Sequence, residues 1–331
     1  MVRFSKLPFR HLVSLYSTHI THTPMILARE FSRSELGRRS DFSTSTFERG
    51  TFWLNEVPHH LYAPEARKKR RRLVRGSLIA QFAANDAKIF ADASELIFPH
   101  VDGIDLNLGC PQKWAYQEKI GSYLLRQPDQ VRDLIRAARD RTGWSFPISI
   151  KIRIDPNLKC TQQLVESGAS HISVHGRTRH QASTLPVDVP GIRFAVECAK
   201  GQVPVVANGD AWSAGESAAI RKKTGVQGVM SARGLLANPA LFDGYERTPM
   251  QAVSTFIRLC SEYGFPFPLF QRHLGFMLEG SFTRVERGYF NSLTSFAGVV
   301  DYLEERGVDM PTVGDVWTPT PHLDSSGGEG I

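Results

Sequence analysis

The sequence GIDLNLGCPQ occupies residues 103–112 and joins a strand pattern to a loop pattern. Five residues, three of them apolar, follow a leading Asp-Gly, and a Gly-Cys-Pro turn comes directly after them. Short apolar runs that end at Gly, Pro, Asn or Asp are typical of buried strands. We expect further strands of this kind at 19–27, 77–83, 147–154, 171–174, 203–207 and 226–231.

Amphipathic stretches separate these apolar runs. Residues 86–98 have helical spacing, and 128–141 open with Pro-Asp, as helices often do. Strands that alternate with helices imply right-handed βαβ units and a parallel sheet. Seven or eight such units in about 240 residues favour an α/β fold, the (β/α)8 TIM barrel, over an open sheet.

The pattern changes twice along the chain. A structureless loop as long as residues 47–76 is unusual inside a compact domain. Beyond residue 249 the strand pattern stops and amphipathic stretches predict helices at 250–263, 268–279 and 283–305. We therefore expect a barrel at 1–246 with an atypical basic insertion at 47–76, a small C-terminal helical domain at 247–309 and a disordered tail at 310–331.

The net charge is concentrated in one segment. The chain has 40 Lys and Arg against 33 Asp and Glu, and residues 67–75 hold seven cations and no acid. Without them the two signs balance, so overall basicity is no evidence for a polyanionic partner. The run itself fits either a solvated loop or a patch for nuclear import or nucleic acid.

Composition also bounds the location of the protein. Four cysteines lie far apart without a CxxC pair, which fits a reducing compartment and predicts no metal site. No run approaches the roughly 18 apolar residues of a membrane span, so we expect no membrane partner. The acid-poor N-terminus fits a mitochondrial transit peptide or the first helix of the fold, at residues 4–16. We favour the helix, and with it the cytoplasm or nucleus over the mitochondrion.

Function in such barrels collects at the carboxyl ends of the strands. The loops after the last two strands usually bind phosphate, because backbone N–H groups and a helix N-terminus converge there. Here those loops contain Asn208-Gly209-Asp210 and Ala232-Arg233-Gly234, which together indicate a phosphate-bearing cofactor. Lys151 and His175 follow neighbouring strands and could donate to an electron-rich ring. Taken singly, they also fit a buried ion pair and a structural histidine.

Cys110 follows a strand end and precedes a proline, so we expect it on a loop at the same edge. A thiol is mostly protonated at neutral pH and can donate a proton. The other three cysteines have no comparable setting. Cys110 is therefore the candidate acid.

At these residues the chain resembles the flavin-dependent tRNA-dihydrouridine synthases. GLLANP and the short helical module are most similar to the eukaryotic branch that acts at tRNA positions 20a and 20b. The resemblance covers roughly residues 2–45 and 77–308 and rests on these segments: QFAAND at 81–86, DGIDLNLGCPQKWA at 102–115, SIKIRI at 149–154, SVHGRTR at 173–179, VVANGD at 205–210, GVMSARGLLANPALF at 228–242 and QRHLGFMLEG at 271–280.

The resemblance implies a barrel that holds FMN and a helical domain that binds tRNA. NADPH or NADH would reduce FMN, and the flavin would pass hydride to C6 of a uracil while Cys110 protonates C5. The target nucleotide would have to leave its stack to reach the site. The implied FMN contacts are Gln81, Lys151, His175, Asn208, Gly209, Asp210, Ala232 and Arg233. The implied substrate contacts are Asn107 on the uracil edge and Arg153, Arg177, Arg179, Arg272, Arg284 and Arg287 on phosphates.

Three features depart from the family pattern. The chain starts at MVRFSK, so we expect the barrel to lack its first strand. Residues 47–76 replace a short connection, and 161–168 look about four residues short, close to one helical turn. A barrel without one strand has two exposed edges beside the flavin, so we expect weak FMN binding or marginal folding.

Two other functions remain open from the residues. One is another FMN-dependent TIM-barrel reductase that acts on a small molecule, against which CPQKW and the helical module argue. The other is a truncated, catalytically inactive remnant that still binds tRNA. In each case we expect a monomer.

Overall fold

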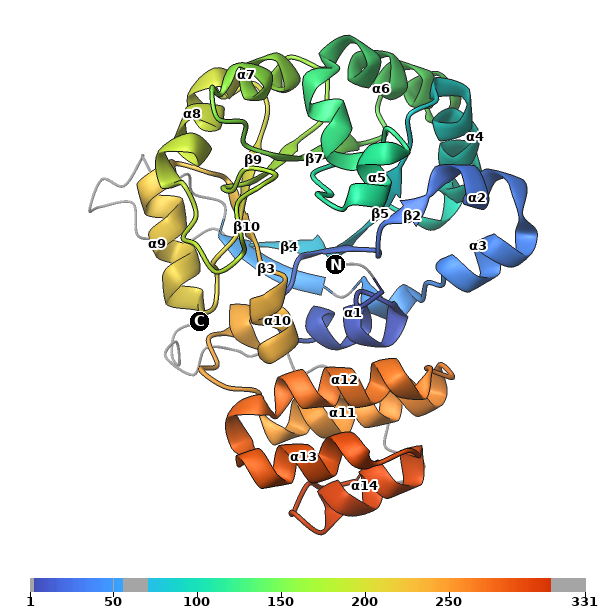
Figure 1. Cartoon of the computed structure of the whole chain (residues 1–331), viewed down its shortest axis with the longest axis vertical. Helices are drawn as coiled ribbons and strands as arrows, with labels where there is room; N and C mark the ends of the chain where they lie inside the picture. The colour runs from blue at the N-terminus through green and yellow to red at the C-terminus, as the bar shows by residue number, and fades with distance from the viewer. Residues whose placement is uncertain (1–2, 50, 56–70, 311–331) are drawn as a thin grey trace, which may run out of the picture.

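The computed structural model describes residues 3–49, 51–55 and 71–310, and for 51–55 and 71–75 it gives the backbone alone. A parallel sheet forms the barrel wall, helices surround it, and a helical module lies at one end (Figure 1). From residue 311 on, the tail expected at 310–331 lies outside the described residues, as do residues 67–70 of the basic run.

The apolar runs form the parallel sheet, as predicted. β6 is buried along its whole length, as expected for a strand covered on both faces. The spatial order is β1-β5-β6-β7-β8-β9-β10, with β2 also paired to β5. The strands are β1 (Ile20–His22), β2 (Ile26–Leu27), β5 (Ser77–Ala83), β6 (Gly103–Leu108), β7 (Ile148–Arg153), β8 (Ile172–His175), β9 (Val205–Asn208) and β10 (Gly228–Met230).

This sheet confirms the α/β, TIM-barrel-like fold. Every neighbouring pair in it is parallel, as right-handed βαβ units require. Within residues 3–49, 51–55 and 71–310, no strand pairing joins β1 to β10. The barrel wall therefore has two strand edges at this point.

The strand expected at 19–27 is interrupted between β1 and β2. Pro24 has no N–H to donate to a neighbouring strand. Beside it a side chain takes the place of a backbone carbonyl, because the Thr23 Oγ1 accepts the backbone N–H of Gln81 at 2.9 Å. One predicted strand thus becomes two short ones on the same neighbour, β5.

The segment predicted as a structureless insertion contains a hairpin. β3 (Thr51–Asn55) and β4 (Arg71–Arg75) pair in antiparallel register as a separate two-stranded sheet. Only one residue, Gly76, separates β4 from β5. The two flanks of the segment therefore pair with each other, in a sheet separate from the barrel wall.

Helices α4, α6, α7, α8 and α9 lie outside the sheet, and α11 to α14 form the module (Figure 1). The α-helices are α1 (Leu7–Ser14), α2 (Ala28–Arg33), α3 (Glu35–Asp41), α4 (Ala87–Ile97), α5 (Lys113–Gln117), α6 (Pro128–Thr142), α7 (Lys159–Val165), α8 (Val189–Ala199), α9 (Ala214–Thr224), α10 (Arg233–Ala237), α11 (Met250–Glu262), α12 (Phe267–Met277), α13 (Arg284–Ser292) and α14 (Phe296–Glu304). The 3-10 turns are η1 (Thr46–Glu48), η2 (Phe98–His100), η3 (Gly121–Arg126), η4 (Leu241–Asp243) and η5 (Glu279–Ser281). In the described part of the chain, no helix is both long and apolar enough to cross a membrane.

The helix predicted over 283–305 is two helices, which corrects that prediction. α13 ends at Ser292, and Ser295 adopts an extended conformation before α14. The Ser295 hydroxyl accepts the backbone N–H of Gly298 at 3.1 Å, which is an N-cap interaction. Capping residues favour the start of a helix. One helix therefore ends and a second begins here, although the amphipathic pattern continues.

Two large apolar cores hold the molecule together. The barrel core lies inside the sheet and between it and the outer helices. The second core joins α1 to α10, α11, α12 and α14, with Phe9 of α1 against Phe256 and Phe270 in one cluster. Figure 1 shows α1 between the barrel and the helical module. α1 is therefore the element that connects the two cores.

A buried ion pair fixes α1 on its barrel side. The Arg10 guanidinium lies 2.7 Å from Glu48, and both side chains are at most 2% exposed. Arg10 also donates to the carbonyls of Ser5 and Ser43 at 2.7 and 2.6 Å. Because each charge satisfies the other, the loss of one partner would leave an uncompensated charge in the interior.

We expect Glu48→Ala to lower the free energy of unfolding by about 3 kcal/mol or more, because it leaves the Arg10 guanidinium buried without its partner. Chemical denaturation followed by circular dichroism measures this. The matched control is Glu35→Ala, which breaks a 2.7 Å pair with Arg39 that is mostly exposed. That variant should unfold almost as the parent does, and equal losses in both variants would contradict the assignment.

Candidate active site

The parallel register places the predicted site residues along one edge of the sheet. Gln81 pairs with Asp105 in β6, and Asn107 pairs with Lys151 in β7. His175 pairs with Asn208 in the next two strands. Side chains from five successive strands therefore meet at their carboxyl ends, as the sequence predicted.

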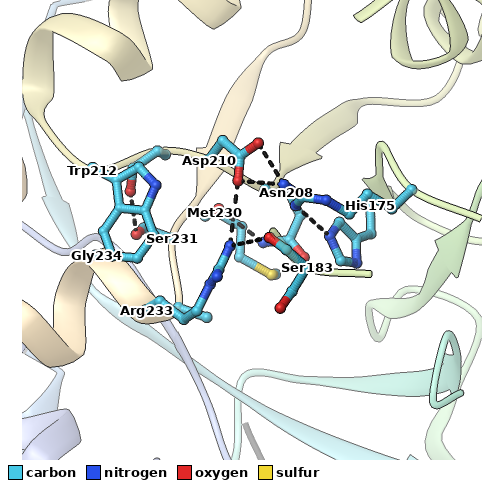
Figure 2. Close-up of a pocket in the computed structure, with 13 residues that line it drawn as sticks. His175, Ser183, Asn208, Asp210, Trp212, Met230, Ser231, Arg233 and Gly234 are labelled. Carbon is cyan, nitrogen blue, oxygen red and sulfur yellow. Dashed lines mark hydrogen bonds and ion pairs between the residues drawn. The ribbon is translucent and has the colours of Figure 1, made fainter. Parts of the chain in front are cut away.

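A pocket of about 90 Å³ lies where β8, β9 and β10 end (Figure 2). Two glycines allow the chain to close around it. A Cβ on Gly209, whose φ is +114°, would lie 2.5 Å from Val187, and one on Gly234 would lie 2.3 Å from the Ala211 carbonyl oxygen. The pocket is lined by six of the residues predicted to bind the cofactor: His175, Asn208, Gly209, Asp210, Ala232 and Arg233.

The charges of this pocket are organised by Asp210. Its carboxylate accepts from Arg177 at 2.6 and 2.7 Å and from the backbone N–H of Val187 at 3.1 Å. It also lies 3.3 Å from Arg233, whose side chain is 46% exposed. Asp210 therefore neutralises Arg177 and orients Arg233, which keeps an accessible guanidinium at the pocket.

Arg177 does not have the exposed position that we predicted for an RNA phosphate contact. Its side chain is 2% exposed and donates to Asp210 and to the carbonyl of Leu185. Arg177 also lies 3.3 Å from the Nε2 atom of His175. A buried guanidinium with these partners supports the pocket wall and offers nothing to a polynucleotide at the surface.

His175 is a neutral imidazole in this setting. Burial, together with the charges of Lys151 and the surrounding arginines, lowers its pKa to about 2. Arginine can only donate, so the His175 Nε2 beside Arg177 carries the lone pair and Nδ1 carries the hydrogen. His175 therefore has one N–H donor to offer a ligand.

Lys151 is a half-buried cation that is available to a ligand. Burial lowers the pKa of its ammonium to about 8, while the nearby Asp105 opposes that shift. Among the residues that the structure describes, none forms a hydrogen bond or ion pair with this ammonium. A protonated donor without a protein partner fits an acceptor on a bound ring.

Cys110 lies directly after β6, at the carboxyl edge where we expected it. The residue is 8% exposed and belongs to a small cluster with Ala83, Ala115 and Ile120, separate from the barrel core. Asn107 holds its backbone, since Oδ1 accepts the N–H of Cys110 at 2.9 Å. The cysteine is therefore fixed beside the site and does not point into the packed interior of the barrel.

The remaining predicted arginines differ in their availability. Arg153 bridges two loops by donating to the carbonyls of Gly109 and Thr178, and Arg179 lies 3.4 Å from the Tyr116 ring centroid. Arg287 contacts Glu279 through both its carboxylate and its carbonyl. Arg272, Arg284 and Arg287 are exposed in the helical module.

Sequence reasoning missed Asp105, which is fully buried and contacts Gln81 and Ser149. The available signal was its place two residues before Asn107, since alternate residues of a strand share a face. No group of His, Cys, Asp and Glu within the described ranges could hold a metal ion.

The model of the dihydrouridine synthase (Dus) family matches residues 1–291. The chain belongs to the dihydrouridine synthase family. Family membership makes it a flavin-dependent oxidoreductase, in keeping with the pocket and the unpaired lysine.

Curated relatives match nearly the whole chain. The tRNA-dihydrouridine(20a/20b) synthase [NAD(P)+] of Schizosaccharomyces pombe is 43% identical over 96% of this chain and 91% of its own length. The corresponding "-like" protein of Homo sapiens is 40% identical over 92% of this chain and 88% of its own. A structure of DHODH from Eimeria tenella matches 61% of this chain and 64% of its own at 14% identity, with a TM-score of 0.41.

We expect Gly121→Ala to displace Cys110. Gly121 has φ +62°, and an added Cβ would lie 2.8 Å from the Cys110 Cβ and 2.9 Å from its carbonyl oxygen. The cysteine must move outward, so its alkylation by iodoacetamide should become at least about threefold faster. Peptide mass spectrometry measures this rate.

The control is Gly201→Ala, because Gly201 has φ +73° and nothing within 4 Å of an added Cβ. Both variants carry backbone strain, of about 1 kcal/mol, but only the first should change the labelling of Cys110. Unchanged labelling in Gly121→Ala would contradict the packing described here.

Proposed function

We propose that this protein reduces uridines of tRNA to 5,6-dihydrouridine, at positions 20a and 20b of the D-loop, with FMN reduced by NADPH or NADH. Family membership and the names of the relatives support this reaction and a nicotinamide cosubstrate. The observation that carries the proposal is that a pocket of about 90 Å³, the Lys151 ammonium and the Cys110 thiol occupy one edge of the sheet.

The residues at this edge fit FMN. Arg233 and the first backbone N–H groups of α10 would hold its phosphate, since the opening turn of a helix leaves such groups without internal partners. Lys151 and the His175 N–H would donate to the ring. Both residues are half-buried, so their N–H groups can be reached by a ligand, and a flavin has acceptors for both.

When bound, the reduced flavin supplies a hydride to C6 of the uracil. Cys110 would supply the proton for C5. The C5=C6 double bond would become a single bond, with one new C–H bond at each carbon, and water would reprotonate the thiolate that remains. Asn107 would orient the uracil with the amide hydrogen that its own contacts leave free. Lys151 would offset negative charge on the ring.

Substrate binding would involve the exposed arginines of the helical module. Arg272, Arg284 and Arg287 could contact tRNA phosphates, and these contacts should weaken with salt as counterions compete. We place the reaction in the cytoplasm or nucleus and expect the protein to act as a monomer.

Replacing Cys110 tests the proton donor. We expect Cys110→Ala to slow the reoxidation of the reduced protein by unmodified tRNA about 100-fold or more, because general acids contribute about that much. Stopped-flow absorbance of the flavin measures it. Cys160→Ala is the matched control. Cys160 lies in α7 beside Asp155 and is not among the residues assigned to the site, so this variant should reoxidise at the parental rate. Parental reoxidation of Cys110→Ala would show that another group donates the proton.

The ionisation of Lys151 predicts a pH dependence for FMN binding. Its lowered pKa of about 8 means that the ammonium is protonated at neutral pH and loses its proton as the pH rises through 8. FMN affinity of the apoprotein should therefore fall as the pH rises above 8, as fluorescence titration can measure.

Lys151→Arg keeps the charge over this range and should remove the fall in affinity, because arginine stays protonated. A flat profile in the parent, or the same fall in Lys151→Arg, would contradict the role of this ammonium.

A further inference from the structure

Asp105 is a buried carboxylate that the proposed reaction does not use. It lies within β6 and is fully buried. Its Oδ1 accepts from the Ser149 hydroxyl at 2.7 Å, and its Oδ2 accepts from the Gln81 amide at 2.8 Å. A carboxylate without water is costly unless such donors satisfy it, so a specific role is expected.

Hydrogen bonds connect Asp105 to Cys110 through two amides. The Gln81 Oε1 atom accepts from the Nδ2 of Asn107 at 2.9 Å. The Oδ1 of Asn107 accepts the backbone N–H groups of Gly109 and Cys110 at 3.1 and 2.9 Å. Strand register pairs Gln81 with Asp105, which brings the first two members of this relay together.

The two ends of the relay fix the direction of both amides. An ionised carboxylate only accepts, and a backbone N–H only donates. If the Gln81 amide were turned over, its oxygen would face Asp105 and its nitrogen would face the Asn107 amide nitrogen. One orientation of each amide therefore satisfies all the groups. Asp105 favours it from inside the barrel, as the two backbone N–H groups do from the loop.

The surroundings of Asp105 are cationic or titratable. Lys151, His22 and His171 lie close enough for its negative charge to raise the pKa of each, against the lowering effect of burial. None of these three forms a hydrogen bond to Asp105 that would replace the one from Gln81. The amide of Gln81 and the hydroxyl of Ser149 are thus its direct partners.

We propose that Asp105 is a positioning residue: by accepting from Gln81 it fixes both amides of the relay and so holds Cys110 in its place at the sheet edge. The relay itself depends only on the hydrogen bonds described above. Its importance for proton transfer rests on the proposed function, in which Cys110 is the donor.

The test measures how well Cys110 is held in the apoprotein. Iodoacetamide labelling of Cys110 is followed by peptide mass spectrometry and divided by the labelling of Cys160 in the same sample. Asp105→Leu removes the acceptor while nearly keeping the volume, so the relay loses its direction. We expect the labelling ratio to rise at least about fivefold as the loop loosens.

Asp105→Asn should rescue the relay. Its Oδ1 can accept from Gln81 while its Nδ2 donates to Ser149, whose hydroxyl can then donate to the Ile104 carbonyl oxygen at 3.3 Å. The labelling ratio should stay within about twofold of the parental value. Ser149→Ala is the control that removes the other hydrogen bond to Asp105, and it should leave the ratio unchanged.

Gln81→Leu breaks the relay at its second member and serves if Asp105→Leu does not fold, as judged by circular dichroism. It should raise the ratio as Asp105→Leu does. A parental ratio in the folded Leu variants, or an Asp105→Asn ratio as high as theirs, would overturn the proposal.

The two proposals fail separately. If labelling follows the relay but Cys110→Ala still reoxidises with tRNA at the parental rate, the positioning role stands and the proton donor is wrong. If the labelling ratio is the same in the Asp105 variants as in the parent while Cys110→Ala reoxidises slowly, Cys110 is the proton donor but Asp105 does not position it.

Discussion

The register of the parallel strands is the constraint on which the site depends. Parallel neighbours align their carboxyl ends, so residues far apart in sequence lie at one edge of the sheet. Strand pairing alone brings them together, and no contact between loops is needed. Gln81, Asn107, Lys151, His175 and Asn208 are placed in this way. A slip of one residue in any strand would turn its side chain to the opposite face. The chemistry therefore depends on the apolar residues that fix the register in the barrel core.

Buried polar contacts then determine which charges stay available. Arg177 is neutralised by Asp210, and this leaves Arg233 accessible at the pocket. Asp105 is satisfied by Ser149 and Gln81, and this leaves the Lys151 ammonium without a partner among the described residues. Each acid in the site is thus satisfied by buried neighbours, and a nearby cation stays accessible to a ligand. A flavin with a phosphate at one end and ring acceptors at the other matches the donors that remain.

Much of this could be predicted from the sequence. Local apolar patterns predict where the strands lie, and the site residues lie at the ends of those strands. The runs at 77–83 and 103–108 coincide with β5 and β6, and the loops after β9 and β10 line the expected pocket. The hairpin β3–β4 was missed, because the pairing of distant residues leaves no periodic signal in either strand. Arg177 was misplaced, because sequence does not show that Asp210 is near enough to bury it. Asp105 was missed for a similar reason, since its partners come from two other strands.

The central claim is that this edge binds a flavin that passes electrons from a nicotinamide to tRNA. The most direct measurement is the absorption spectrum of the purified protein, recorded first alone, then after NADPH in the absence of oxygen, then after unmodified tRNA. The account predicts a yellow protein that bleaches with NADPH and recovers its colour only with tRNA. A colourless protein that binds no added FMN, or a reduced flavin that tRNA leaves bleached, would contradict it.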